Sequence, residues 1–177
     1  MSETGQSYWS LVEAIYEKVD IYNGSQGFLA SIALVPRPLG ILYAAHFCLS
    51  EVQNGGFLQF FLNSTGVLAP EAIEGFDAIQ MPQLAAVVRE TIALLGEPYP
   101  RDRTERSKAL LRTSGRDESD LTQIFKEAKN LYLAYTKATE TLPFDALDRR
   151  IWDLAESENG GFDQASDRYL QSLSTAL

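Results

Sequence analysis

Residues 51–63 read EVQNGGFLQFFLN, and residues 156–164 read ESENGGFDQ. Both segments contain the tetrapeptide NGGF, and in both a glutamate precedes the asparagine by three positions. At an offset of 105 residues, positions 49–59 and 154–164 share seven identities over eleven positions. This offset is far longer than the repeat of a solenoid protein. We interpret the two segments as one structural junction that is made twice.

At each junction we expect an amphipathic helix to end, the paired glycines to turn the backbone, and the phenylalanine to anchor the next helix on the core. Gly55 or Gly56 in the first copy, and Gly160 or Gly161 in the second, should have a positive φ. Adjacent glycines also expose backbone amides that could hold an anion, but that signal is weak alone. The sequence therefore favours a structural role for both copies.

Helical periodicity extends outward from the first copy in both directions, beginning with a predicted helix from about Leu39 to Gln53. The other predicted helices cover residues 8–19 behind a Ser7 N-cap and before Asn23-Gly24, residues 69–80, 82–95, 104–113 and 121–135, and the segments that begin at Pro143 and Phe162. Residues 26–35 fit either a short buried helix or a strand. The sequence predicts an all-α fold, a single compact domain of about eight to ten helices over residues 1–177.

Acidic residues outnumber basic ones by 24 to 15, which gives a formal net charge of −9 at pH 7. Residues 140–167 alone hold eight acidic and two basic residues. Such a surface repels phosphate groups, so we expect no direct binding to nucleic acid, whereas a basic protein partner remains open. The alternative is that the charge serves solubility.

The composition is that of a globular protein, with 45% hydrophobic residues in a chain of 177. The sequence contains no run of about 18 apolar residues that could span a membrane. A basic segment followed by an apolar one, as in a secretory signal, is absent from the first thirty residues. We therefore predict a cytoplasmic protein without a membrane partner.

Candidate catalytic residues are few. His46 is the only histidine and Cys48 the only cysteine. Two positions apart on a helix they point about 200° away from one another, which excludes a Cys-His nucleophile pair made from these two residues. A single histidine and a single cysteine also argue against a zinc site of the usual ligand types. Gln59 and Asn63 share a helical face, where such amides more often bond to neighbouring backbone than bind a substrate.

No nucleophile, base and orienting group can be named together, so we predict no enzyme activity, no cofactor and no metal. The alternative is a small helical enzyme or ligand-binding domain with a cleft near Glu51, Asn54 and Gln59.

The first copy of the motif resembles the hallmark of a bacterial family of acidic helical domains, long labelled as of unknown function. The matching residues are Asn54, Gly55, Gly56, Phe57, Gln59, Phe60, Phe61 and Asn63. The resemblance implies a DNA mimic, because the characterised type of the family carries carboxylates arranged like duplex phosphates. That protein occupies the DNA-binding face of a helix-turn-helix repressor and relieves repression. The activity belongs to the acidic surface, so we interpret the motif itself as structural.

The best candidate for such a surface is the helix over residues 145–156. At about 100° per residue, four of its carboxylates fall within an arc of roughly 140° opposite the apolar face, interrupted by Arg149. The next helix extends this surface, so the predicted protein-binding residues are Asp145, Asp148, Asp153, Glu156, Asp163 and Asp167. The predicted partner is a basic DNA-binding protein such as a helix-turn-helix repressor, and a homodimer is left open.

Overall fold

The computed structural model describes residues 7–174, which form ten α-helices, three short 3-10 helices and no strand. In chain order they are α1 (Tyr8–Glu13), η1 (Tyr16–Lys18), α2 (Gly24–Ile32), α3 (Arg37–Leu62), η2 (Ser64–Leu68), α4 (Ala69–Ala78), α5 (Pro82–Ala93), α6 (Arg103–Thr113), α7 (Glu118–Glu127), α8 (Leu131–Ala138), α9 (Phe144–Ser157), η3 (Glu158–Gly160) and α10 (Phe162–Ser174). The predicted all-α class and number of helices are confirmed. The predicted domain also includes residues 1–6 and 175–177, which lie outside the described range.

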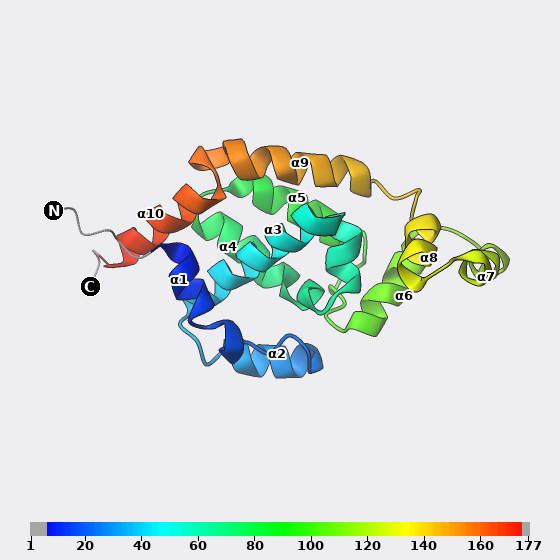
Figure 1. Ribbon diagram of the computed structural model, residues 1–177, viewed down its shortest axis with the longest axis horizontal. Coiled ribbons are helices and arrows are strands. Elements are labelled where there is room, and N and C mark those ends of the chain that lie inside the picture. Colours follow the sequence, from blue (N-terminus) through cyan, green and yellow to red (C-terminus); the bar gives the residue numbers. More distant parts are fainter. Residues whose placement is uncertain (1–6, 175–177) are drawn as a thin grey trace.

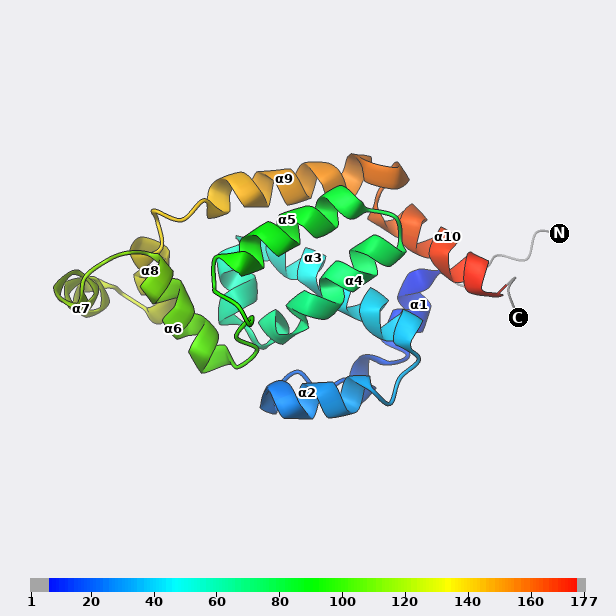
Figure 2. The same cartoon turned by 180° about the vertical axis from the view of Figure 1, so that it is seen from behind.

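Helix α3 is the centre of the fold. Residues 40–45 are all buried, and because a helical turn holds 3.6 residues, this run is buried around the whole circumference of the helix. A helix that is apolar on every side has to be surrounded by other elements, and α1, α4, α6 and α9 all pack against α3. Figure 1 shows α3 in front of α4 and α5, and Figure 2 shows these two helices covering it from behind.

The first copy of the motif breaks α3 near its C-terminal end. Gly55 has φ −158° and ψ 23°, and Gly56 has φ 75° and ψ 176°, a region that is essentially restricted to glycine. The helix resumes at Phe57, whose side chain is fully buried. The predicted helix end at these glycines and the predicted positive φ are confirmed.

The second copy makes a similar turn between α9 and α10. Gly160 has φ 77°, and Gly161 has φ 91° and ψ 158°, close to the conformation of Gly56. Phe162 then begins α10 with its ring buried. The prediction of one junction made twice is therefore confirmed for the second glycine and the phenylalanine of each copy.

Two arginines close the C-terminal end of α3. Arg106 is 1% exposed and donates from Nε to the carbonyl of Phe61 at 3.0 Å and from Nη2 to the carbonyl of Asn63 at 2.7 Å. Arg103 donates to the carbonyl of Leu62. The last carbonyls of a helix lack helical partners and carry partial negative charge, so these cations fix the end of the helix.

The predicted helix over residues 8–19 is wrong in its length. Helix α1 ends at Glu13, and a separate 3-10 turn follows at residues 16–18. The hydroxyl of Ser7 makes no capping hydrogen bond. Because a 3-10 turn holds three residues instead of 3.6, Tyr16 leaves the buried face and is 48% exposed. Gly24, which was expected to close this helix, begins α2.

The predicted long helix over residues 121–135 is two helices, α7 and α8. Ala128 has the extended values φ −69° and ψ 137°, and the side chain of Asn130 accepts a hydrogen bond from the backbone of Leu133 at 2.9 Å. An asparagine that caps a new helix favours a break, which lets Phe125 and Tyr135 meet edge to face with ring centroids 5.3 Å apart. In Figure 1, α7 lies at the end of the molecule opposite α10.

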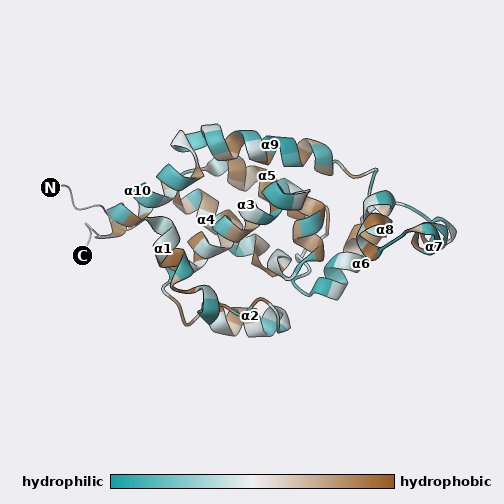
Figure 3. Ribbon diagram, viewed as in Figure 1, coloured by the Kyte–Doolittle hydropathy of each residue, from teal (hydrophilic) through white to brown (hydrophobic). Residues whose placement is uncertain are grey.

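The ambiguous segment at residues 26–35 is resolved as helix for most of its length, since α2 covers residues 24–32 and buries Phe28 completely. In Figure 3 hydrophilic residues cover much of α9 and α10. Within the described range, no helix has the length and apolar character needed to cross a membrane.

Candidate partner-binding groove

The acidic helix α9 is anchored on the break in α3. Asp148 accepts a hydrogen bond on Oδ1 from the backbone N–H of Phe57 at 2.8 Å. Phe57 is the first residue after the glycine break, and the first N–H groups of a helical segment have no partner within it. A carboxylate from a neighbouring helix therefore caps the second half of α3 and fixes α9 against it.

The same contact explains why Gly56 has to be a glycine. A Cβ atom at this position would lie 2.3 Å from Oδ2 of Asp148. Burial raises the pKa of Asp148, the Phe57 N–H lowers it, and nearby Asp145 raises it, so that the pKa as a whole lies above its ordinary value. The cost of desolvating this carboxylate thus outweighs the effect of its hydrogen bond.

Two adjoining hollows lie between α3 and the α9–α10 segment, and together we call them the α3–α9 groove. Gln53 lines both of them. The first has a volume of about 380 Å³ and includes Gly55, Gly56, Asp148, Trp152 and Asp153. The second has a volume of about 320 Å³ and includes Glu156, Gly160, Gly161, Asp163 and Gln164. Both copies of the NGGF motif thus open on one groove.

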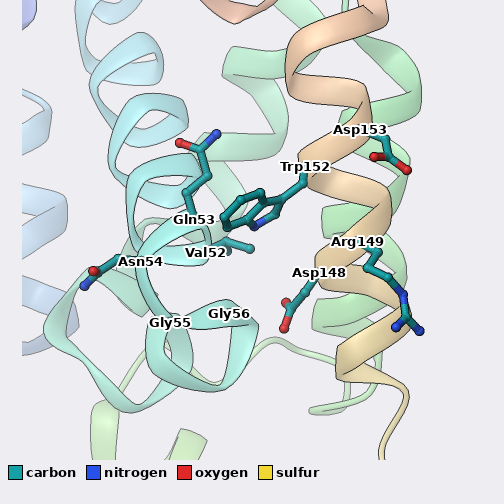
Figure 4. A pocket seen from close by; sticks show the side chains of 9 residues that line it. All are labelled: Val52, Gln53, Asn54, Gly55, Gly56, Asp148, Arg149, Trp152 and Asp153. Atoms are coloured by element: carbon teal, nitrogen blue, oxygen red, sulfur yellow. The ribbon is translucent and has the colours of Figure 1, made fainter.

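Figure 4 shows how the side chains of the first hollow are arranged. Trp152 reaches from α9 toward Val52 and Gln53 of α3, and Asp148 points toward Gly56. Arg149 and Asp153 point away from α3, on the outer side of α9. Trp152 therefore lies between the two helices, and the charged groups of Arg149 and Asp153 lie on the outer edge of the groove.

The structure brings four of the six predicted acidic residues to the α3–α9 groove: Asp148, Asp153, Glu156 and Asp163. Asp145 is exposed in the first turn of α9. Asp167 instead accepts a hydrogen bond from the backbone N–H of Tyr8 at 2.7 Å, and Asp163 accepts one from the Tyr8 hydroxyl at 3.1 Å. These two carboxylates thereby tie α10 to α1.

Within the described residues, no ion pair neutralises the carboxylates that line the α3–α9 groove. Elsewhere in the described chain, basic side chains pair with Glu71, Glu74, Asp77, Glu90, Glu105 and Glu140. In residues 7–174, no such pair reaches Asp145, Asp153, Glu156 or Asp163. Arg150 is directed to Glu90 at 2.6 Å, Arg168 donates to the carbonyl of Asn159 beside the second hollow, and Arg149 lies on the outer side of α9. Four of the eight acidic residues at positions 140–167 thus line this groove.

A family model described as DMP19-like protein matches residues 33–173. The chain belongs to the DMP19-like protein family. This is a non-enzymatic DNA-mimic family, which confirms the resemblance at the level of the family. The matched range contains both NGGF copies and all six predicted acidic residues. Among curated proteins and solved structures, none matches the chain.

The polar residues of the first motif are bound to one another. The amides of Gln59 and Asn63 donate to Oε2 of Glu51 at 2.9 and 3.0 Å. The expectation that these amides bond to neighbouring backbone is therefore wrong, because the carboxylate one turn before the break takes both. This cluster joins the two halves of α3, and of Glu51, Asn54 and Gln59 only Asn54 lines the α3–α9 groove.

The candidate nucleophile lies in the core. Cys48 is completely buried, and burial raises the pKa of its thiol. His46 is in contact with Tyr8, whose hydroxyl lies 3.2 Å from Nδ1, and burial lowers the pKa of the imidazole. Within residues 7–174, no three of the histidine, cysteine, aspartate and glutamate side chains are grouped so that they could hold a metal ion.

Sequence reasoning missed Trp152, which is 49% exposed in the groove. A signal was present, because at about 100° per residue Trp152 falls between Asp148 and Glu156 on the helical wheel, inside the acidic arc. It also missed Glu158, which accepts hydrogen bonds from the backbone of Gln83 and Leu84 at 2.9 Å each and so caps α5. That contact joins residues far apart in the chain and left no local signal.

Proposed function

We propose that this protein is a DNA mimic that occupies the DNA-binding surface of a basic DNA-binding protein, such as a helix-turn-helix repressor, and competes there with duplex DNA. The observation that carries the proposal is the set of uncompensated carboxylates at the α3–α9 groove, in a member of a DNA-mimic family. The protein acts by binding alone, without catalysis. A repressor as partner would place both proteins in the bacterial cytoplasm, and a homodimer stays a prediction.

Mimicry requires carboxylates that are held in place, because a duplex presents one charge per about 1.7 Å of axis in a fixed arrangement. Three sets of hydrogen bonds supply this rigidity to the acidic elements. Asp148 fixes α9 to α3, Glu158 fixes η3 to α5, and Asp163 with Asp167 fixes α10 to α1. The freely exposed carboxylates of Asp145, Asp153 and Glu156 are then available to arginine and lysine side chains that would otherwise contact phosphates.

The proposal is tested with a charge-reversed variant that leaves the capping residue Asp148 intact. Asp145→Lys, Asp153→Lys and Glu156→Lys are combined in a variant reversed on α9. The matched control carries Glu97→Lys, Glu118→Lys and Glu127→Lys, three exposed acids outside α9 and α10. Immobilised protein is exposed to bacterial lysate at low salt, and each captured DNA-binding protein is purified and bound to a fluorescent duplex of its own operator. Displacement of the duplex is then followed by anisotropy.

We expect the unmodified protein and the control to displace the duplex. The variant reversed on α9 should fail, because its three lysines repel the basic side chains of a DNA-binding surface. Circular dichroism checks that all three proteins are folded. A partner that binds the variant reversed on α9 as tightly as the control, or that binds protein and duplex together, contradicts the proposal.

A further inference from the structure

A second cleft, beside α1, differs in chemical character from the α3–α9 groove. It lies between α1, η1 and α3, has a volume of about 550 Å³, and is lined by Trp9, Glu13, Tyr16, Glu17 and Phe47, with Ala14 and Lys18. We call it the N-terminal cleft. Except for Phe47, its lining residues precede the range that the family model matches. The cleft is therefore a feature of this chain that the family assignment does not account for.

The aromatic side chains of the cleft are exposed but held in place. Trp9 is 40% exposed, and its ring centroid lies 4.7 Å from that of His46. Tyr16 is 48% exposed and packs on Phe47 with centroids 5.6 Å apart. The 3-10 turn that interrupts the first helix is what brings Tyr16 to this surface. Aromatic faces gathered around a cavity are a typical binding surface for a ligand with a flat or cationic group.

Two carboxylates define the charge of that ligand. Glu13 lies one helical turn after Trp9, on the same face of α1, and Glu17 follows Tyr16 directly. Neither forms an ion pair with a basic side chain of residues 7–174, and Lys18 lies beyond 4 Å from both. Burial lowers the pKa of neighbouring His46, so its ring is uncharged at neutral pH. The two carboxylates would repel an anionic ligand, and a purely apolar ligand would gain nothing from them, whereas a cation would be attracted.

We propose that the N-terminal cleft binds an arginine side chain of a protein partner, with the guanidinium plane against the rings of Trp9 and Tyr16 and its N–H groups on Glu13 and Glu17. Arginine fits better than lysine because its planar fork stacks on aromatic rings while it donates to carboxylates. One guanidinium fills only a part of a 550 Å³ cavity, which leaves room for the residues on either side of it. The cleft is separate from the α3–α9 groove, so binding there does not depend on DNA mimicry.

The test uses the full chain labelled with ¹⁵N and a blocked peptide, acetyl-Gly-Ser-Arg-Ser-Gly-amide. Its twin peptides carry citrulline, which keeps the shape of arginine without the charge, or lysine. Trp9 and Trp152 are the two tryptophans, and their indole N–H resonances report on the two surfaces separately once Trp152→Phe has assigned them. We expect a saturable shift of the Trp9 resonance with the arginine peptide and an affinity about fivefold lower for the citrulline and lysine peptides.

Two double variants test whether the carboxylates of Glu13 and Glu17 bind the guanidinium. Glu13→Gln with Glu17→Gln should weaken the response of Trp9 to the arginine peptide about fivefold, whereas Glu97→Gln with Glu118→Gln removes the same charge elsewhere and should leave it unchanged. The response should also persist when Asp145, Asp153 and Glu156 are reversed to lysine, which separates this site from the groove. The absence of a saturable shift at Trp9, equal binding of the three peptides, or equal weakening by both glutamine pairs contradicts the proposal.

Discussion

The two NGGF copies share a sequence and a backbone turn but use their glutamate and glutamine in opposite ways. In the first copy Glu51 accepts a hydrogen bond from Gln59 inside the fold. In the second copy the equivalent Glu156 and Gln164 are both exposed, make no hydrogen bond to one another within the described residues, and line the α3–α9 groove. The same motif thus stabilises a helix break in one place and presents a free carboxylate in the other, and the difference comes from what packs around it.

The two copies should differ most in the free energy of unfolding that is lost when their second glycine, Gly56 or Gly161, is replaced by alanine. Gly56→Ala combines an unfavourable φ with the loss of the Asp148 cap, so we expect a loss of about 3 kcal/mol or more in the free energy of unfolding. At Gly161 a Cβ would meet no atom closer than the Glu156 carbonyl at 3.3 Å. Gly161→Ala should therefore cost the backbone strain and a small shift of the Glu156 carbonyl, together about 1 to 2 kcal/mol. Urea unfolding followed by circular dichroism measures both, and equal losses would contradict the role assigned to Asp148.

A smaller effect on stability, one that depends on pH, should follow from the raised pKa of Asp148. Its folded pKa lies above the ordinary value of 3.8, so the folded state holds the proton more tightly than the unfolded state. The contribution of this group to stability is present below pH 3.8 and is lost as the pH rises through the folded pKa. Asp148→Asn keeps an oxygen that can accept from Phe57 but cannot ionise.

We therefore expect the free energy of unfolding of the native protein to fall, relative to the Asp148→Asn variant, as the pH is raised from about 3 to 6. Urea unfolding at several pH values measures this difference. A difference that changes in the opposite direction would show that the hydrogen bond from Phe57 outweighs desolvation.

The smallest expected difference in stability is between alanine variants of the two glutamines, Gln59 and Gln164. Gln59→Ala removes one of the two hydrogen bonds to half-buried Glu51, so we expect it to cost about 1 kcal/mol. Gln164→Ala removes an exposed side chain without such a bond, and its effect should stay within about 0.5 kcal/mol. Thermal unfolding of the two variants side by side makes the comparison. Equal losses of stability in the two variants would mean that the hydrogen bond from Gln59 to Glu51 contributes nothing to stability.

Local signals allowed much of the fold to be predicted. The glycine pairs fixed both helix breaks because a positive φ depends on the residue itself. The helical spacing of α9 placed Asp145, Asp153 and Glu156 outside, since an amphipathic helix must bury its apolar face. The break at Ala128 could not be predicted from spacing, because the apolar period continues across it while the cap at Asn130 interrupts the helix.

Contacts between distant segments account for what the sequence did not reveal about the site. Asp148 was expected to face solvent with its neighbours, yet it caps a helix 91 residues away in the chain. Glu158 does the same for Leu84, 74 residues away. Nothing in the spacing of either residue distinguishes a carboxylate that caps from one that is free to bind a partner. Only the packing of α9 on α3 and α5 decides which carboxylates of the acidic surface are free.

The most direct test of the proposed mimicry is the rate of association with a captured DNA-binding protein as a function of ionic strength. Exposed charges are screened over about 8 Å at physiological salt, so the rate for the native protein should fall steeply as salt is raised. The variant with Asp145, Asp153 and Glu156 reversed to lysine should associate slowly at every salt concentration, and the Glu97, Glu118 and Glu127 control should follow the native protein. Association that ignores both salt and the reversal at α9 would contradict the account.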